Sequence, residues 1–155
     1  MKMRVIETNV GIQNEVTVEM FDSFARTMRD RGWNGGDSMI ASGLRGGDML
    51  EIGPGPGYVG LEIAKKLTPD SLTGCEISPA MLQFARKNAK NYGIDARYVQ
   101  GNCMEMPFED ESFDIVTGFE TIYFWPDFIN DLKEVNRVLK KDGLVFFCNE
   151  AVYRE

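Results

Sequence analysis

A cluster of glycines, placed between an apolar run and a helical pattern, is the feature that most constrains how this chain can fold. Residues 50–60 read Leu-Glu-Ile-Gly-Pro-Gly-Pro-Gly-Tyr-Val-Gly. They overlap the end of a short run, Asp48–Ile52, and lead into a helical pattern over about Tyr58–Leu67. Glycine lets the backbone approach a ligand closely, and a helix N-terminus offers free N–H groups. A strand, a glycine loop and a helix in this order are typical of a nucleotide-binding loop, although a tight turn without a ligand has the same pattern.

Short apolar runs and longer helical patterns alternate from residue 48 onward, without a repeat or a Pro/Ser-rich linker. This alternation is typical of a parallel sheet whose strands are joined by helices. The expected strands are Asp48–Ile52, Leu72–Ile77, Arg97–Gln100, Ser112–Gly118 and Leu144–Cys148. The expected helices are Tyr58–Leu67, Ser78–Tyr92 and Pro126–Lys140, the last stopped by Gly143. We predict an α/β fold with a doubly wound, mainly parallel sheet of about five strands, whose apolar fifth strand is covered on both faces.

The first 47 residues differ from the rest, so we divide the chain into an N-terminal helical segment (1–47) and a sheet domain (48–155). An amphipathic helix is predicted over Glu15–Arg31, and a short second helix over Met39–Leu44, capped by Asp37 and Ser38. The apolar face of the first helix has two interpretations, which are packing into the core and a lid over a ligand site. Its apolar residues are Met20, Phe21, Phe24 and Met28.

The amino-acid composition excludes several classes of partner, catalytic site and metal site. The chain has 155 residues, enough for one domain, and its net charge of −7 does not favour nucleic acid or anionic lipid as a partner. It contains no histidine, which excludes His-based nucleophile systems and His-ligated metals. Three cysteines without C-x-x-C spacing argue against a zinc site or a disulfide framework, so no metal is expected. No long apolar run or signal-peptide core is seen, so we expect a cytoplasmic protein without membrane segments.

The glycine cluster fits two ligand-binding patterns. Gly55-x-Gly57-x-x-Gly60 matches the dinucleotide pattern of NAD-dependent oxidoreductases, whereas Glu51 stands two residues ahead of the alternating Gly53, Gly55 and Gly57. A carboxylate at the mouth of the loop disfavours a diphosphate and favours a ligand with an ammonium and a sulfonium group. The second pattern explains more residues, and the NAD-binding alternative leaves Glu51 unexplained.

Two further polar residues follow predicted strands. Glu76 lies 19 residues after Gly57, where a carboxylate can accept hydrogen bonds from both ribose hydroxyls, although it could also cap the next helix. Asn102 has an amide that can donate and accept against an adenine edge, although turn formation is the simpler explanation for Gly101-Asn102.

These residues together resemble the class I S-adenosylmethionine-dependent methyltransferases, in particular the small-molecule branch that includes quinone-biosynthesis C-methyltransferases. The resemblance covers roughly residues 48–149 and implies a Rossmann-like fold with S-adenosylmethionine as cofactor. Four landmarks in order carry it, at 50–57, 74–82 (Gly-Cys-Glu-Ile-Ser-Pro-Ala-Met-Leu), 101–108 (Gly-Asn-Cys-Met-Glu-Met-Pro-Phe), and Phe113-Asp-Ile-Val116 followed by the helical segment 132–143.

The resemblance also implies roles for individual residues. The glycine loop would hold the methionine part of the cofactor, Glu76 the ribose, and Ile77 one adenine face. Asn102 stands where the family more often has Asp, so its amide oxygen would meet the adenine amino group. Phe119 and Glu120 would lie near the methyl group, although core packing and a solvated carboxylate explain them equally well. The implied cofactor-binding set is Glu51, Gly53, Gly55, Gly57, Glu76, Ile77, Asn102, Cys103 and Phe119.

The implied reaction is an in-line methyl transfer to a small-molecule acceptor, which depends mainly on alignment and exclusion of water. A proton-accepting residue is not obligatory, and the candidates for one are Glu120, Tyr123 and Glu150. The aromatic residues after the fourth strand and on the first helix suggest an aromatic or apolar acceptor. The alternative function is a catalytically inactive S-adenosylmethionine-binding module or subunit.

The C-terminal part departs from the family pattern. Family members usually continue from the fifth strand to a final antiparallel hairpin, and here about two strands are expected to be lacking. The strand at Leu144–Cys148 would then be an exposed edge, which proteins seldom leave uncovered. We therefore expect a homodimer contact, or other cover, along this strand.

Overall fold

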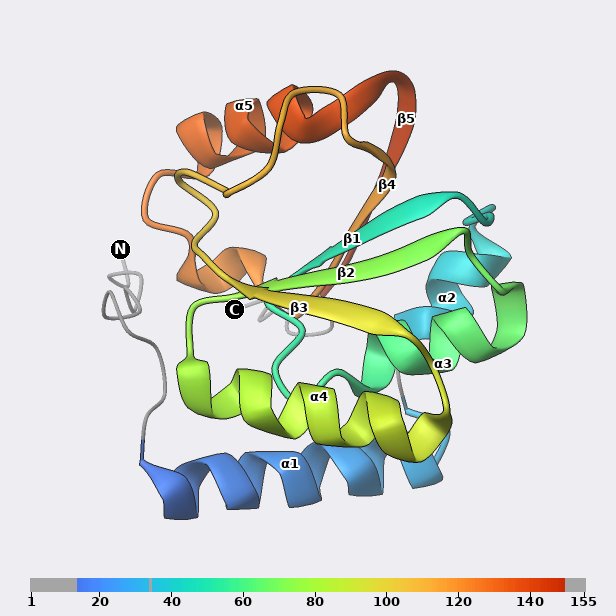
Figure 1. The fold of residues 1–155 in the computed structure, drawn as a ribbon, viewed down its shortest axis with the longest axis vertical. Helices are drawn as coiled ribbons and strands as arrows, with labels where there is room; N and C mark the ends of the chain where they lie inside the picture. Colours follow the sequence, from blue (N-terminus) through green and yellow to red (C-terminus); the bar gives the residue numbers. More distant parts are fainter. Residues whose placement is uncertain (1–13, 34, 150–155) are drawn as a thin grey trace, which may run out of the picture.

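The computed structural model describes residues 14–33 and 35–149, which form one parallel sheet with helices on both faces (Figure 1). The sheet order is β3-β2-β1-β4-β5, and every strand pair is parallel, which confirms the predicted Rossmann-like, doubly wound architecture. The strands are β1 (Asp48–Ile52), β2 (Ser71–Glu76), β3 (Ala96–Gln100), β4 (Phe113–Phe119) and β5 (Leu139–Cys148). The helices are α1 (Glu15–Asp30), α2 (Gly35–Ala41), α3 (Tyr58–Leu67), α4 (Pro79–Tyr92) and α5 (Phe128–Val138), with a 3₁₀ turn η1 (Ile122–Phe124).

Capping residues set the ends of α4 as the sequence predicted. The side chain of Ser78 accepts a hydrogen bond from the backbone N–H of Met81, and Pro79 occupies the first helical position. Gly93 ends the helix in the left-handed conformation, at φ 67°. Of all the helices in the described ranges, none is long and apolar enough to cross a membrane.

Two apolar cores lie on the two faces of the sheet. Met49 and Ile115 pack beneath α2, α3 and α4, whereas Leu50 and Val116 face α5. Successive residues of β1 and β4 thus point to opposite faces, as the period of a strand requires. Glu51 shares the face of Met49 and therefore lies on the α3 and α4 side of the sheet.

The strand order reverses between β1 and β4, and this reversal positions the site. The chain passes from β1 outward to β2 and β3, and then returns to β4 and β5 on the other side. Loops that follow β1 and β4 therefore diverge and leave a crevice at the carboxyl ends of the strands. The glycine loop that follows β1 lies at this crevice.

Two predicted helices have other bounds in the structure. The second helix is Gly35–Ala41 rather than Met39–Leu44, so Asp37 and Ser38 lie within it instead of capping it, and Asp37 forms an ion pair with Lys66 of α3. The helix predicted to run to Lys140 ends at Val138. Lys140 instead binds Asp48 and Asp114 at 3.1 and 2.9 Å, and these tertiary contacts draw it into β5.

The fifth strand is longer and less covered than predicted. It starts at Leu139 and is interrupted by a shift in its pairing with β4, because Phe113 pairs with Leu139 but Ile115 pairs with Leu144. The prediction of cover on both faces was wrong, since Leu144 is 42% exposed and no β5 residue is fully buried. Within residues 14–33 and 35–149, β5 lies at the edge of the sheet and has a strand neighbour on one side only.

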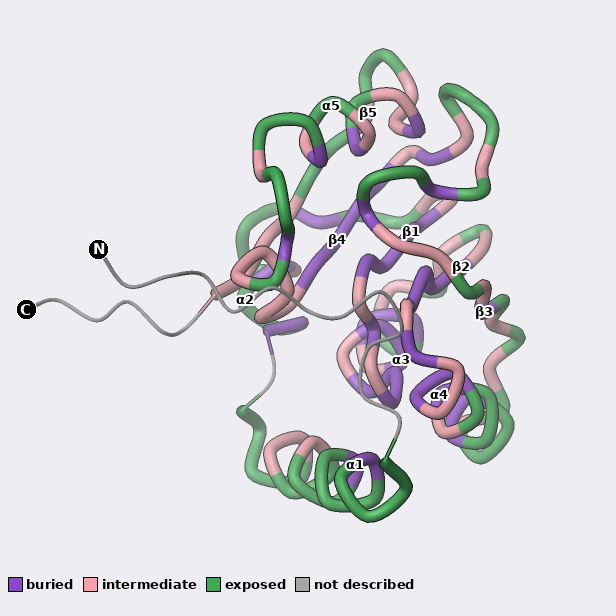
Figure 2. Tube along the Cα trace, turned by 90° about the vertical axis from the view of Figure 1, so that its left-hand side faces the viewer, coloured by how far each residue is buried: buried purple, intermediate pink, exposed green. Residues whose placement is uncertain are grey.

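Helix α1 lies outside α3 and α4, and most of its length is exposed (Figure 2). The interpretation of its apolar face as core was wrong, because Met20 is 68% and Phe24 is 61% exposed. Its two buried residues are Val18 and the polar Asp22. α1 thus contacts the rest of the protein through a face that combines the apolar Val18 with the polar Asp22.

Candidate active site

A cavity of about 750 Å³ opens at the carboxyl ends of β1, β2 and β4 and extends to α1. Most of its walls are apolar, with a few carboxylates near the strand ends. The residues that line it from the sheet domain include Glu51–Pro56, Tyr58, Val59, Cys75–Ser78, Met81, Gly101–Met104, Phe119–Thr121 and Phe124–Pro126, and α1 and the segment after it add Phe21, Phe24, Ala25, Met28, Arg29 and Trp33.

The structure brings most of the predicted site residues to this one cavity. Gly57 does not line its wall, and Tyr123 does not either. Glu150 lies outside the described residues. The predicted residues that line the cavity are Glu51, Gly53, Gly55, Glu76, Ile77, Asn102, Cys103, Phe119 and Glu120.

The glycine loop adopts backbone conformations and close contacts that only glycine accommodates easily. Gly53, Gly55 and Gly57 have φ values of 65°, 53° and 89°, in the left-handed region. A Cβ at Gly53 would lie 2.5 Å from the Thr121 hydroxyl oxygen, and a Cβ at Gly57 would lie 2.8 Å from the Tyr98 hydroxyl oxygen. Gly53 and Gly55 thus bring backbone to the cavity wall, whereas Gly57 packs over Tyr98 and begins α3.

Glu76 connects the loop to the start of α4. Its Oε2 accepts the backbone N–H of Gly55 at 3.0 Å, and its Oε1 accepts the backbone N–H of Ser78 at 2.9 Å. Burial raises the pKa of this carboxyl, and the backbone hydrogen bonds oppose the shift. The contact with the start of the next helix that was considered for Glu76 is therefore present. The side chain also lines the cavity, and its remaining lone pairs could accept hydrogen bonds from a ligand there.

Glu51 is a buried carboxyl at the base of the loop, with 2% of its surface exposed. Its Oε2 has no hydrogen-bond partner among the described residues. A Cβ at Gly60 would lie 2.2 Å from this oxygen, so the side chain points beneath the first turn of α3. Burial raises the pKa of Glu51 to about 8, the nearby Glu76 adds to the shift, and a hydrogen bond from the Gly60 backbone opposes it. Glu51 thus carries a proton more readily than an ordinary carboxyl.

A buried polar network that sequence reasoning missed supports the loop from below. The amide nitrogen of Asn88 donates to the Pro56 carbonyl and to Asp22, both at 2.9 Å. The Tyr58 hydroxyl donates to the same Asp22 oxygen at 3.0 Å. One buried carboxylate of α1 is therefore joined to the glycine loop and to α3. A sequence signal for Asn88 existed, because it falls three residues after Ala85 on the apolar face of α4.

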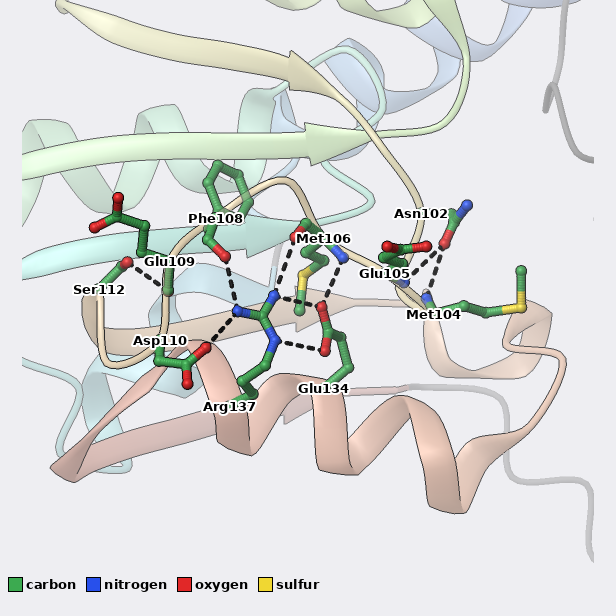
Figure 3. A network of polar contacts seen from close by, with 10 residues as sticks. All are labelled: Asn102, Met104, Glu105, Met106, Phe108, Glu109, Asp110, Ser112, Glu134 and Arg137. Carbon is green, nitrogen blue, oxygen red and sulfur yellow. Dashed lines mark hydrogen bonds and ion pairs between the residues drawn. The ribbon is translucent and has the colours of Figure 1, made fainter.

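Asn102 forms a turn rather than offering its oxygen to the cavity. Its Oδ1 accepts the backbone N–H groups of Met104 and Glu105 at 2.9 and 3.1 Å (Figure 3). Its amide nitrogen points away from these bonds. The side chain is therefore better arranged to donate a hydrogen bond than to accept one, unlike the contact that the resemblance implied.

Arg137 of α5 holds the loop between β3 and β4. It donates to the carbonyl oxygens of Met106 and Phe108 and forms ion pairs with Asp110 and Glu134 (Figure 3). The guanidinium group of Arg137 is planar and has five N–H donors, so it can bind these carbonyl and carboxylate oxygens at the same time. The loop that carries Asn102 and Cys103 is thus fixed from its far side.

Sequence reasoning also missed Thr121 and Arg29 as cavity residues. Cys103 was predicted, and burial raises the pKa of its thiol to about 12, so it lines the cavity as a neutral group. Within the part of the chain that the structure describes, no group of three His, Cys, Asp or Glu side chains could hold a metal ion.

The chain matches the family model described as a methyltransferase domain over residues 50–147, and it belongs to that family. A stretch of 106 residues is 37% identical to a probable phthiotriol/phenolphthiotriol dimycocerosates methyltransferase 2 of Mycobacterium ulcerans, covering 68% of this chain and 40% of that protein. A stretch of 106 residues is also 31% identical to a fatty-acid O-methyltransferase of Mycolicibacterium smegmatis, covering 68% of this chain and 38% of that protein. The chain thus spans about two fifths of the length of these curated relatives.

Solved structures agree with this assignment. A putative S-adenosylmethionine-dependent methyltransferase of Methanococcus maripaludis has the same fold, with a TM-score of 0.81, 23% identity, and coverage of 93% of this chain and 67% of that chain. A possible histamine N-methyltransferase of Thermotoga maritima gives a TM-score of 0.63 and 28% identity, with coverage of 83% and 57%. The family and the fold together place this chain among the class I methyltransferases, whose cofactor is S-adenosylmethionine.

The residues of the cavity fit that cofactor. The glycine loop brings backbone without side chains to the cavity wall at Gly53 and Gly55. Glu76 presents a carboxyl group to the same wall, and Glu51 holds a buried oxygen without a partner among the described residues. Buried carboxyl groups suit a ligand that carries an ammonium, a sulfonium and ribose hydroxyls.

Proposed function

We propose that this chain binds S-adenosylmethionine in the described cavity and transfers its methyl group to a small, largely apolar acceptor. The observation that carries the proposal is the joint presentation of the glycine loop and Glu76 at one wall of the cavity. The family match and the names of the relatives support it.

Two carboxyl groups and the loop would hold the cofactor. Glu76 would accept hydrogen bonds from the ribose hydroxyls while it keeps the Gly55 N–H in place. The backbone of Gly53 and Gly55 would lie against the methionine part, and the buried carboxyl group of Glu51 would lie beneath it. Ile77 and Cys103 would contact the adenine, and Asn102 would donate to its edge. When bound, the cofactor supplies a methyl group on a sulfonium, which is already a good leaving group.

The chain's own contribution to the reaction would be alignment and exclusion of water. Phe119 and the apolar side chains of α1 would form the acceptor side of the cavity, with α1 acting as a lid. Glu120 lines the same region and would take a proton if the acceptor needed a base. Tyr123 does not line the wall and is the weaker candidate, whereas Glu150 is retained from the sequence alone.

Calorimetric titration with S-adenosylmethionine, S-adenosylhomocysteine and NAD tests the cofactor assignment. We expect binding of the first two and none of NAD. Glu76→Gln should weaken binding about tenfold or more, because one acceptor oxygen is replaced by a donor. Glu109→Gln, which changes an exposed carboxylate outside the cavity, is the matched control. Equal affinities of both variants would show that Glu76 serves only the start of α4.

Transfer of labelled methyl to apolar acceptors then separates an enzyme from the alternative, an inactive binding module. Fatty acids are a first acceptor set, because one relative is named a fatty-acid O-methyltransferase. Cofactor binding without transfer to any acceptor would favour the inactive module.

We also propose that the edge of β5 is covered by a second copy of the chain. The motivation is the exposed apolar pair Leu144 and Val145 on an edge strand. Light scattering that gives a monomer, together with rapid amide exchange in β5, would contradict this contact.

A further inference from the structure

The mouth of the cavity is ringed by exposed apolar side chains. Half of the large apolar residues that are exposed in the described structure also line the cavity. We call this set the apolar rim, and its members are Phe21, Phe24, Trp33, Met104 and Phe124. Single exposed apolar residues need no explanation, but a contiguous group around a binding site marks a surface that takes an apolar partner.

Polar contacts hold α1 in the orientation that creates this rim. Asp22 accepts hydrogen bonds from Tyr58 and Asn88, and Arg29 donates to the Tyr92 hydroxyl at 2.9 Å. Together with the buried Val18, these contacts fix one side of α1 against α3 and α4. The apolar side is consequently left facing the cavity and the solvent instead of the core.

The apolar surface of α1 continues beyond the cavity. Phe24 lines the cavity, whereas Met20 and Val16 do not, and all three are exposed. They are spaced four residues apart, so they form one row along the helix. The row from Phe24 to Val16 spans about 12 Å at 1.5 Å per residue. It gives the rim a narrow extension in one direction.

We propose that the acceptor is an amphiphile with a single alkyl chain, whose reacting end lies in the cavity and whose chain leaves over Phe24 and lies along Met20 and Val16. This inference rests on the proposed function and adds the class of its acceptor. A compact polar acceptor would use neither the rim nor its extension. A narrow row on one helix matches the width of one chain, and its continuity with the cavity favours the chain of a bound acceptor over a separate partner.

Binding of alkyl chains of different length tests the proposal without a methyl-transfer assay. Both tryptophans of the chain, Trp33 and Trp125, line the cavity, so intrinsic fluorescence reports its occupation. The probes are hexanoate, decanoate and tetradecanoate below their micelle-forming concentrations, with S-adenosylhomocysteine present. The matching alkan-1-ols repeat the series without the head-group charge. We expect tighter binding with each added methylene, by up to about fourfold per group where the chain is fully buried.

Surface variants locate the chain. Met20→Ser should weaken tetradecanoate binding at least fivefold and change hexanoate binding less than twofold, because Met20 does not line the cavity. Phe24→Ser should also weaken tetradecanoate binding at least fivefold. Ile129→Ser is the matched control, because Ile129 is 63% exposed on α5 and does not line the cavity. All three residues are exposed, so the variants should fold.

Several results would overturn the inference. They are affinity independent of chain length, a loss of the same size with Ile129→Ser, or a loss with Met20→Ser that is equal for hexanoate and tetradecanoate. Binding of phosphatidylcholine vesicles without binding of monomeric probes would assign the rim to a membrane surface instead. Failure of the proposed function is recognised separately, since S-adenosylhomocysteine would then show no calorimetric binding.

Discussion

Replacement of Glu51 by glutamine should increase the stability of the folded protein, relative to that of the wild type, as the pH rises. Glu51 is buried, and burial raises its pKa to about 8 from an ordinary value of 4.5. The folded state therefore binds the proton more tightly than the unfolded state does. Stability from this group is fully present below pH 4.5 and is lost as the pH rises towards 8.

The expected size follows from the two pKa values. Between pH 4.5 and pH 7 the unfolded chain releases this proton and the folded chain keeps most of it, which costs about 3 kcal/mol at 1.36 kcal/mol per pKa unit. Glutamine has the same shape and no charge to lose. The free energy of unfolding of Glu51→Gln, minus that of the wild type, should therefore increase by about 3 kcal/mol over this range.

Urea unfolding of both proteins at pH 4.5, 5.5, 6.5 and 7 measures this difference. All other titrating groups are common to the two proteins and cancel in the subtraction. Glu109→Gln, which removes an exposed carboxylate, controls for the loss of one negative charge. A difference between Glu51→Gln and wild type that stays constant over the pH range, or that decreases, would refute the reasoning from a buried carboxyl with a raised pKa.

Three other substitutions test the supports of the site. Asn88→Ala should destabilise the protein by about 1–3 kcal/mol, because the Pro56 carbonyl and Asp22 lose a buried donor, and it should weaken binding of S-adenosylhomocysteine in calorimetry. Gly60→Ala should lower the unfolding midpoint, because its Cβ would lie 2.2 Å from a Glu51 oxygen; an unchanged midpoint would mean that this carboxyl can move away. Arg137→Met should increase amide exchange in residues 102–112 and leave exchange in β1 unchanged, whereas an equal increase in both would indicate general destabilisation.

The sequence predicted the sheet and the loop because both depend on local patterns. Short apolar runs define β1 to β4, and the glycine spacing defines the turn before α3, so the cavity could be placed before the structure was known. The end of α5 could not be predicted in this way. Residues 138–140 continue the helical pattern, but Lys140 is held by Asp48 and Asp114, which are distant in sequence.

The supports of the site were missed for the same reason. Asp22 and Asn88 lie 66 residues apart, and no local sequence pattern indicates that the fold joins them by a hydrogen bond. The oxygen of Asn102 was assigned to a ligand by resemblance, yet two backbone N–H groups two and three residues later use it. The apolar pattern on α1 predicted a helix correctly, but a pattern cannot distinguish a face that packs on protein from one that faces a cavity.

The way α1 is attached has a consequence for how such a protein can diversify. Its anchoring contacts come from Asp22, Arg29 and the buried Val18, whereas Val16, Met20 and Phe24 contribute little to the packed interior. Mutations on that outer row therefore cost little folding free energy. A lineage could exchange these side chains, and with them its preferred acceptor, while the sheet and the cofactor loop stay unchanged.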